Sequence, residues 1–167
     1  MNLYFMRHGI AEDRATGKNS DDRQRTLTPK GTKRIQKEAK ALIRLSLSFD
    51  RILTSPLARA RETAKIIAQS LQLEERLAEI EQLGPERSVQ ELLSGLAAYA
   101  GDKNILLVGH EPLLSSTVAF LLSEKSAVHI ELKKGGLCCL QVDGIRPKKS
   151  AVLLWALTPK QLRLLAP

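Results

Sequence analysis

Short apolar runs alternate with longer amphipathic segments along this chain. The clearest runs are "NLYFM", "RILTS" and "NILLVG". Each is five or six residues long and rich in Leu, Ile or aromatic side chains, as expected for buried strands. Between the first two runs, apolar residues recur at helical spacing at Ile35, Ala39, Leu42 and Ile43. Alternating strands and helices predict a mostly parallel sheet with helices on both faces.

Cap residues followed by proline predict where several helices begin. Thr28-Pro29 and Ser55-Pro56 each place a hydroxyl side chain before a proline at the first helical position. Ser88 and Glu91 have the spacing of a capping box, in which each side chain bonds to the main chain of the other residue. Thr158-Pro159 predicts a short helix near the end of the chain.

The last third of the chain changes character. After an apolar helix expected over 113–122 come three strand-like runs. They are "AVHIEL" (127–132), "GLCCLQV" (136–142) and "AVLLWAL" (151–157). Asp143-Gly144 and Pro147 separate the last two runs, as a hairpin connection requires. No linker divides the chain. We therefore predict one α/β domain over residues 1–167, a three-layer α/β/α sandwich with a mostly parallel mixed sheet.

The chain is basic, with 26 Lys and Arg against 18 Asp and Glu and a formal net charge of +8. Much of the excess lies between Arg14 and Arg44, which contains ten basic and only three acidic residues. Such a segment favours an anionic partner, such as a phosphorylated substrate or an acidic protein surface. A solvated helix face is the other interpretation. Nucleic acid is disfavoured because the chain has no Walker loop, zinc-finger spacing or basic stretch interleaved with aromatic residues.

The cysteine content and the apolar runs point to a cytoplasmic protein. Cys138 and Cys139 are adjacent in a predicted strand, where neighbouring side chains point to opposite faces, so a disulfide between them is not expected. The N-terminus lacks the basic and apolar regions of a signal peptide. No apolar run reaches the ~18 residues that a membrane-spanning helix needs.

Chemically distinctive residues follow the three strand-like runs of the first two thirds. Arg7-His8-Gly9 ends the first run, Ser55-Pro56 ends the second with Arg59 in the next helical turn, and Gly109-His110 ends the third. Ligands of open α/β sheets bind outside the carboxyl ends of the strands, where helix N-termini favour anions. If these strands are neighbours, two arginines and two histidines surround one anion, and phosphate is the best candidate.

The residue types in this group suit phosphoryl transfer. A guanidinium group supplies forked, permanently charged donors for phosphoryl oxygens, and Arg7 and Arg59 provide two of them. A neutral imidazole is a nucleophile toward phosphorus, and nearby cations disfavour protonation of His8. Gly9 removes bulk beside the attacking ring. We expect His8 to be the nucleophile and His110 to donate to the phosphoryl oxygens.

The motifs "RHG", "SPLARARETA" and "VGHEPLL", in this order, resemble those of the histidine phosphatase superfamily, which has the phosphoglycerate-mutase-like fold. The chain length and the last motif are similar to the bacterial phosphohistidine phosphatase branch. The resemblance implies that His8 accepts the phosphoryl group and that Arg7, Arg59 and His110 complete the phosphate pocket. It also implies that Arg25, in "RTLTPKG", reaches toward the phosphate. We expect no metal ion or cofactor, because the sequence has no carboxylate cluster of metal-ligand type and the arginines supply the positive charge.

Larger members of this superfamily carry an acidic proton donor after the second helix. The matching segment here is "LAEIEQLGPERS", which places Gln82 at the donor position, with Glu81 as the possible acid. A phosphohistidine needs a donor less than an alkyl phosphate does, because its ring can leave as neutral imidazole once the other ring nitrogen is protonated, and that nitrogen titrates near neutral pH. The expected substrate is therefore a phosphorylated histidine on a signalling protein, such as a histidine phosphotransfer-type domain. The alternatives are hydrolysis of a small phosphorylated metabolite or sugar phosphate, and a non-catalytic domain that binds anions or phosphoproteins.

Overall fold

The computed structural model describes residues 1–13, 21–123, 128–145 and 151–166. Within these ranges the chain forms one six-stranded sheet, in the order β3-β2-β4-β1-β5-β6. The strands are β1 (Asn2–Arg7), β2 (Arg51–Thr54), β3 (Leu77–Glu79), β4 (Asn104–Gly109), β5 (Leu137–Val142) and β6 (Ala151–Leu157). The helices are α1 (Pro29–Arg44), α2 (Ala58–Leu71), α3 (Val89–Leu96), α4 (Leu113–Leu122) and α5 (Pro159–Leu165). Short 3-10 helices cover Asp22–Gln24, Glu74–Arg76, Glu81–Leu83 and Ala97–Tyr99.

The sheet is mostly parallel, as predicted. β4 lies at its centre and pairs in parallel with both β1 and β2, and β3 extends this parallel part. β5 pairs antiparallel with β1, and β6 pairs antiparallel with β5. In this register Arg7 is opposite Gly109 and Thr54 is opposite Val108, so the carboxyl ends of β1, β2 and β4 meet at one edge.

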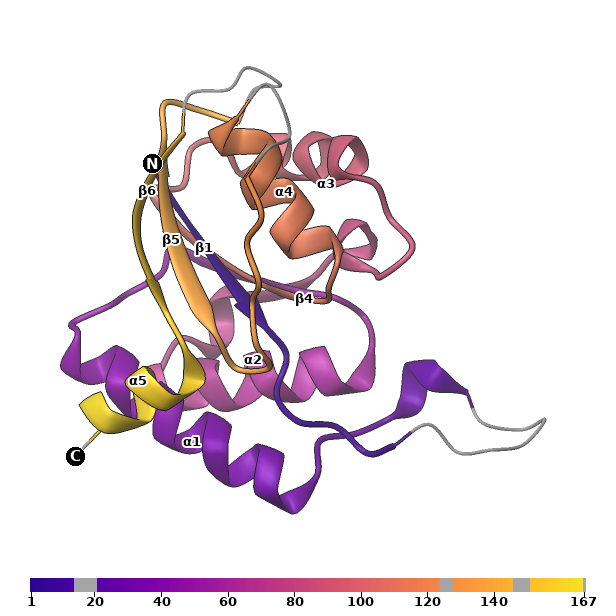
Figure 1. The fold of residues 1–167 in the computed structure, drawn as a ribbon, viewed down its shortest axis with the longest axis vertical. Helices are drawn as coiled ribbons and strands as arrows, with labels where there is room; N and C mark the ends of the chain where they lie inside the picture. The colour runs from indigo at the N-terminus through magenta and orange to yellow at the C-terminus, as the bar shows by residue number, and fades with distance from the viewer. Residues whose placement is uncertain (14–20, 124–127, 146–150, 167) are drawn as a thin grey trace.

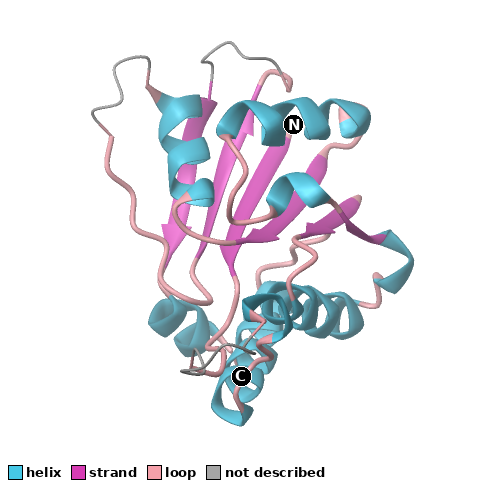
Figure 2. Cartoon of the chain, turned by 90° about the vertical axis from the view of Figure 1, so that its right-hand side faces the viewer, coloured by secondary structure: helices cyan, strands magenta, loops and turns pink. Residues whose placement is uncertain are grey.

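Helices cover both faces of the sheet, giving the predicted three layers (Figure 1, Figure 2). On one face α1, α2 and α5 bury an apolar cluster that includes Ile35, Ile67 and Leu162. On the other face α3 and α4 bury a second cluster that includes Leu92 and Val118. Buried Ala, Leu and Ile side chains dominate the first cluster, and buried Leu side chains dominate the second. This packing holds the strand ends rigidly, which matters for the side chains that follow them.

Most of the predicted helix starts are confirmed. The Thr28 hydroxyl accepts a hydrogen bond from the Gly31 amide at the start of α1, and Ser88 and Glu91 form the expected capping box. Thr158 caps α5 in the same way. The second helix begins later than predicted, at Ala58. The Ser55 hydroxyl instead accepts from the Leu57 amide within the turn before it.

The predicted strand over 127–132 is wrong for residues 128–132, which form an irregular segment. Both sides of β5 are already paired, so this segment has no free strand edge beside β5, and its Ile130 and Leu132 pack on the α3–α4 side instead. Ala127, Pro147 and residues 14–20 of the predicted first loop lie outside the described residues. β3 was not predicted. Within the described ranges, no helix has the length and apolarity needed to cross a membrane.

Candidate active site

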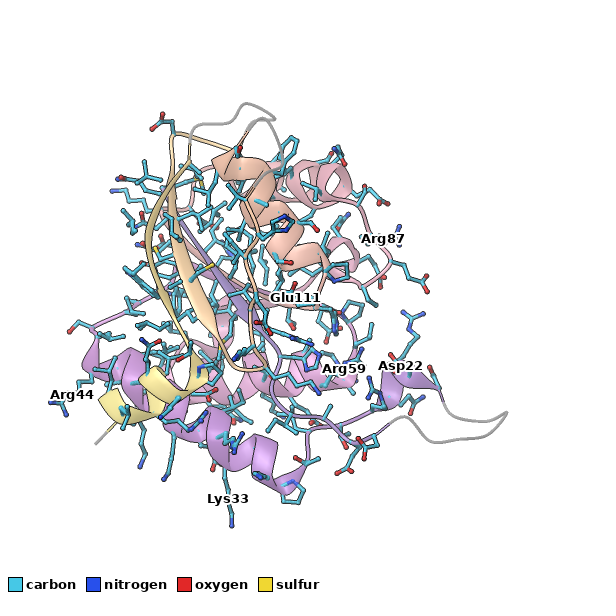
Figure 3. All side chains as sticks on the ribbon, viewed as in Figure 1. Asp22, Lys33, Arg44, Arg59, Arg87 and Glu111 are labelled. Atoms are coloured by element: carbon cyan, nitrogen blue, oxygen red, sulfur yellow. The ribbon has the colours of Figure 1, made fainter. Side chains whose placement is uncertain are left out.

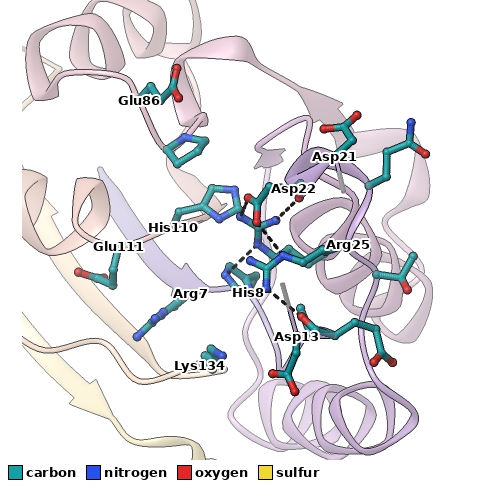
Figure 4. Close-up of a pocket in the computed structure, with 16 residues that line it drawn as sticks. Arg7, His8, Asp13, Asp21, Asp22, Arg25, Glu86, His110, Glu111 and Lys134 are labelled. Atoms are coloured by element: carbon teal, nitrogen blue, oxygen red, sulfur yellow. Dashed lines mark hydrogen bonds and ion pairs between the residues drawn. The ribbon is translucent and has the colours of Figure 1, made fainter. Parts of the chain in front are cut away.

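The sheet edge brings the predicted side chains together. The His8 amide donates to the Gly109 carbonyl at 3.1 Å, and the Ser55 amide donates to the Val108 carbonyl at 3.0 Å. These bonds tie the residues after β1 and β2 to β4, where His110 follows. The rings of His8 and His110 lie with their centroids 5.0 Å apart (Figure 4). Three chain segments distant in sequence therefore meet at one point.

The contacts of His8 fix its tautomer. Its Nδ1 lies 2.7 Å from the carbonyl oxygen of Gly9, and because a carbonyl only accepts, Nδ1 carries the hydrogen. Its Nε2 accepts a hydrogen bond from Nε of Arg59 at 3.3 Å. The Gly9 amide donates to the Thr63 hydroxyl at 3.0 Å, which holds the backbone beside the ring. His8 is thus a buried, neutral imidazole whose lone pair on Nε2 faces a guanidinium group.

Gly9 also allows a close approach between β1 and α1. A Cβ at this position would lie 2.8 Å from Cγ1 of Ile35, closer than packed carbon atoms can sit. The absence of a side chain therefore lets the backbone after His8 lie directly on the first turns of α1, close to the ring.

Both imidazoles are held neutral. Burial lowers the pKa of His8 to about 4, and the charges of Arg59 and Arg7 act in the same direction. Burial also lowers the pKa of His110 to about 3, assisted by His8 and Arg59. Desolvation disfavours a charged ring, and neighbouring cations disfavour it further. A lone pair is therefore available on His8 throughout the neutral pH range.

Arg59 is anchored by a residue that the sequence did not reveal. Its Nη1 donates to the main-chain oxygen of Asp22 at 2.8 Å, and its Nη2 lies 3.1 Å from the Asp22 carboxylate. The other oxygen of this carboxylate lies 2.7 Å from Nε of Arg25. Asp22 thus bridges the two arginines. It lies in a polar segment without periodicity, so only its tertiary contacts identify it.

Arg7 is positioned by the segment that precedes β5. Its Nη1 donates to the Leu132 carbonyl at 3.0 Å, and its main chain bonds to Gly135 and Gly136. These main-chain bonds place the turn that carries Lys134 beside His8. Lys134 is another cavity residue that the sequence did not indicate. The irregular segment at 128–132 therefore contributes a carbonyl group that orients Arg7.

Three buried side-chain nitrogens lack a hydrogen-bond partner within the described part of the chain. Nε of Arg25 is one of them, but it forms an ion pair with Asp22, whereas Nε of Arg7 and Nδ1 of His110 have no partner there. Nε2 of His110 lies 2.8 Å from the Ser55 hydroxyl, which already accepts from the Leu57 amide. The Ser55 hydroxyl can donate its hydrogen to Nε2 of His110, and in that tautomer the ring proton is on Nδ1. Buried donors are rarely left unpaired, so an anion beside Arg7 and His110 would satisfy both.

A cavity of about 950 Å³ contains this group. Arg7, Arg25, Arg59 and Lys134 supply positive charge to its wall. Its acidic lining residues are Glu12, Asp13, Asp21, Asp22, Glu86 and Glu111. Asp22 lies between two of the arginines, whereas Glu12, Asp13, Asp21 and Glu86 are exposed at the margin of the cavity. In the described residues, no group of three or more His, Cys, Asp or Glu is arranged to hold a metal ion.

Glu81, the expected proton donor, is not in the lining of this cavity. It lines a neighbouring cavity of about 370 Å³ that shares Asp22 and Glu86 with the first. Gln82 packs beside Gly95 of α3. Two carboxylates near α3 and α4 do line the cavity that contains His8. They belong to Glu86 and Glu111. Burial raises the pKa of Glu111, while a hydrogen bond from the Ser115 hydroxyl opposes this shift.

Comparison with known proteins agrees with this geometry. The sequence profile of the histidine phosphatase superfamily (branch 1) matches residues 3–84. A protein of Haemophilus influenzae described as a phosphohistidine phosphatase SixA homolog is 32% identical over 139 residues. The match covers 77% of this chain and 81% of that protein.

Solved structures with the same fold extend over nearly the whole chain. The protein histidine phosphatase SixA, solved with tungstate, has a TM-score of 0.84 and 24% identity, covering 97% of this chain and 99% of that one. The α-ribazole phosphatase of Shigella flexneri has a TM-score of 0.70 and 22% identity, covering 92% and 94%. At these identities the structures show the shared phosphoglycerate-mutase-like fold.

Proposed function

The chain belongs to the histidine phosphatase superfamily, and we propose that it hydrolyses phosphohistidine on a protein through a covalent intermediate on His8. One observation carries the proposal. Nδ1 of His8 is committed to the Gly9 carbonyl, while Nε2 keeps its lone pair and faces Nε of Arg59 at 3.3 Å. This is the arrangement of a nucleophile beside the cation that receives the phosphoryl oxygens.

The reaction has two displacement steps. In the first, Nε2 of His8 attacks phosphorus, and the bond between phosphorus and the substrate imidazole breaks. The substrate ring, already protonated on its other nitrogen before the step, takes the electron pair of the broken bond and leaves as neutral imidazole. In the second, water attacks phosphorus, the bond to His8 breaks, and inorganic phosphate is released with the ring of His8 again neutral. Each step is an in-line transfer in which positioning and charge stabilisation lower the barrier.

The surrounding donors stabilise the charge that develops on the phosphoryl oxygens. Nε of Arg7 and, when it carries the ring proton, Nδ1 of His110 have no partner in the described residues and are therefore available to the phosphoryl oxygens. Arg59 and Arg25 add permanent charge, and Asp22 fixes the orientation of both guanidinium groups. Because these side chains supply the positive charge, the proposed reaction needs no metal ion or other cofactor.

Phosphohistidine is the favoured substrate for two reasons. The Haemophilus influenzae relative is described as a phosphohistidine phosphatase homolog. In addition, Glu81 and Gln82 lie outside the cavity that contains His8. They occupy the position after the second helix where an acid was expected. An imidazole leaving group tolerates a weak acid better than an alkoxide does. The two buried, unpaired thiols of Cys138 and Cys139 suit a reducing compartment, so we place the reaction in the cytoplasm.

A second candidate function is hydrolysis of a small alkyl phosphate. Two observations favour it: Glu86 and Glu111 both line the cavity, so either carboxyl group is available as a proton donor, and the fold is shared with an α-ribazole phosphatase. The two functions differ in the leaving group, and direct comparison of substrates separates them.

The test compares a phosphohistidine peptide with a panel of alkyl and sugar phosphates, using phosphate release under identical conditions. We expect kcat/KM for the phosphohistidine peptide to exceed that for every alkyl phosphate by at least tenfold, and EDTA to leave the rate unchanged. Faster turnover of an alkyl phosphate would assign the enzyme to the second candidate. A His8→Ala variant measures contaminating activity.

A further inference from the structure

The solvent-facing side of α1 carries only basic charged residues. Lys30, Lys33, Lys37, Lys40 and Arg44 are all exposed. They are spaced three, four, three and four residues apart, so they form one row, about 21 Å long, on one side of the helix. We call this row the basic stripe. Figure 3 shows Lys33 and Arg44 projecting outward, away from the body of the protein.

The stripe has no counter-charge within the described part of the chain. None of its five side chains lies within ion-pair distance of a carboxylate there. The only acidic residue of α1, Glu38, is buried and pairs with Arg163 of α5 at 2.6 Å. Like charges at helical spacing repel one another and destabilise a helix. An acidic surface laid along the stripe would turn this repulsion into attraction.

A hollow of about 500 Å³ lies beside the first half of the stripe, between α1 and α5. Lys30, Lys33 and Lys37 line it together with Arg34 and Arg163. The stripe is therefore part of a concave basic surface, which can surround an acidic side chain from more than one direction.

The stripe begins next to the catalytic cavity. α1 starts at Pro29, three residues after Thr26, which lines that cavity. The Thr28 amide donates to the Ile10 carbonyl at 2.9 Å, so the first turn of the helix lies against the backbone that follows His8. A macromolecule that places a phosphorylated side chain in the cavity therefore has the Lys30 end of the stripe as its neighbour.

We propose that the basic stripe binds an acidic surface on the protein that carries the phosphohistidine. This inference rests on the proposed function. Charge complementarity favours a protein over a nucleic acid, because the exposed carboxylates of Glu12, Asp13 and Asp21 at the cavity margin repel a continuous phosphate backbone. α1 also has no aromatic side chain on which bases could stack.

Such a surface acts on encounter rather than on chemistry. Complementary charge accelerates association and loses its effect as salt screens it, while the bond-breaking step is unchanged. The stripe should therefore raise kcat/KM for an acidic substrate and leave kcat near its basal value.

The test uses phosphohistidine peptides with the same phosphorylated core and a twelve-residue tail on either side. The tail contains six Glu in one set and six Gln in the other. At low ionic strength we expect kcat/KM to be about tenfold higher for the Glu set, with the preference lost at 0.5 M NaCl. Lys33→Glu/Lys37→Glu should remove the preference. Lys65→Glu/Lys103→Glu, which changes two exposed lysines elsewhere by the same net charge, should keep it.

The outcomes separate this proposal from the proposed function. Equal turnover of the Glu and Gln sets, or a preference that survives Lys33→Glu/Lys37→Glu, overturns the role of the stripe while leaving phosphohistidine hydrolysis intact. If neither set is hydrolysed, the proposed function fails, and fluorescence anisotropy of the unphosphorylated Glu peptide still tests stripe-dependent binding. Stripe-dependent binding of single-stranded DNA or of vesicles containing phosphatidylglycerol, without binding of the Glu peptide, would assign the surface to another polyanion.

Discussion

Arg59 is held by Asp22 at both of its terminal nitrogens, through the main-chain oxygen at 2.8 Å and the carboxylate at 3.1 Å. The remaining nitrogen, Nε, is directed at Nε2 of His8. A long, flexible side chain is thereby fixed in one orientation, and the same carboxylate also contacts Arg25. The placement of charge around His8 therefore depends on Asp22, which lines the same cavity.

Replacing Asp22 by Ala should therefore impair catalysis. Hydrogen bonds to charged groups contribute about 1.5–3 kcal/mol, which corresponds to roughly a 10- to 100-fold loss in kcat/KM. Inhibition by phosphate or tungstate should weaken in parallel, because Arg59 loses its preferred orientation. Steady-state kinetics with each inhibitor measure both effects. Asp21→Ala, which removes a neighbouring exposed carboxylate, is the matched control.

The opposite result is equally informative. If Asp22→Ala were faster than the wild-type protein and bound phosphate more tightly, the carboxylate would be a competitor for the two arginines rather than their anchor.

The pKa values of the two site histidines lead to a prediction for solution NMR. With pKa values lowered to about 4 for His8 and about 3 for His110, chiefly by burial, both rings stay neutral from pH 8 to pH 5. Imidazole ¹⁵N spectra, assigned with His8→Asn and His110→Asn, should show His8 as the Nδ1–H tautomer throughout. A midpoint near 6.5 for His8 would contradict the proposed resting state.

The same shifts affect stability with a definite sign. Between about pH 6.5 and pH 4 the unfolded chain binds protons at these two positions and the folded protein does not. Protonation therefore favours unfolding, so the two rings reduce stability as the pH falls through this range. Thermal unfolding as a function of pH measures this loss of stability. The loss between about pH 6.5 and pH 4 should be smaller in His110→Asn than in the wild-type protein.

The carboxylates near His8 distinguish the two candidate substrates. If Glu86 or Glu111 acts as a general acid for an alkyl phosphate, the corresponding Gln variant should lose about 100-fold or more in kcat on that substrate. For phosphohistidine we expect each variant to stay within about threefold of the wild-type rate, because the substrate ring, once protonated on its other nitrogen, leaves as neutral imidazole. A large loss on phosphohistidine in either variant would show that its release requires acid assistance. Glu81→Gln is the control outside the cavity.

The buried pair of Glu38 and Arg163 gives a prediction about stability. Burial raises the pKa of Glu38 to about 7, so its contribution is greatest below about pH 4.5 and decreases as the pH rises through 7. Arg163→Met should cost about 3 kcal/mol at pH 8, because an unpaired carboxylate is left buried, and less at pH 5. Denaturant unfolding measures this. Adding Glu38→Gln should recover most of the loss at pH 8, and no recovery would indicate that Arg163 acts through packing alone.

The sequence was most informative where local chemistry determines structure. The strands around Phe5, Leu53 and Leu107 are apolar on both sides because helices cover both faces, and this pattern is visible without coordinates. Polar residues directly after such strands must meet at one sheet edge, which is why His8 and His110 could be placed near each other from sequence.

The features that could not be predicted depend on tertiary contacts. β3 has only three residues and no apolar run that would predict a strand. It is a strand because it pairs with β2. Residues 128–132 alternate like a strand but have no free edge of β5 to pair with. Asp22 is an acidic residue in a polar loop until folding brings Arg59 and Arg25 to it. Ser55 has the sequence pattern of a helix cap. Its hydroxyl instead accepts a hydrogen bond from the Leu57 amide in a turn and lies within hydrogen-bond distance of Nε2 of His110.

The most direct test of the account is to trap the covalent intermediate. The protein is mixed with a ³²P-labelled phosphohistidine peptide, quenched in alkali within the first turnover, digested and mapped by mass spectrometry. If His8 is the nucleophile, we expect one acid-labile, alkali-stable phosphoryl group, attached to His8 and absent from His8→Asn. Label on any other residue, or multiple turnovers by His8→Asn, would contradict it.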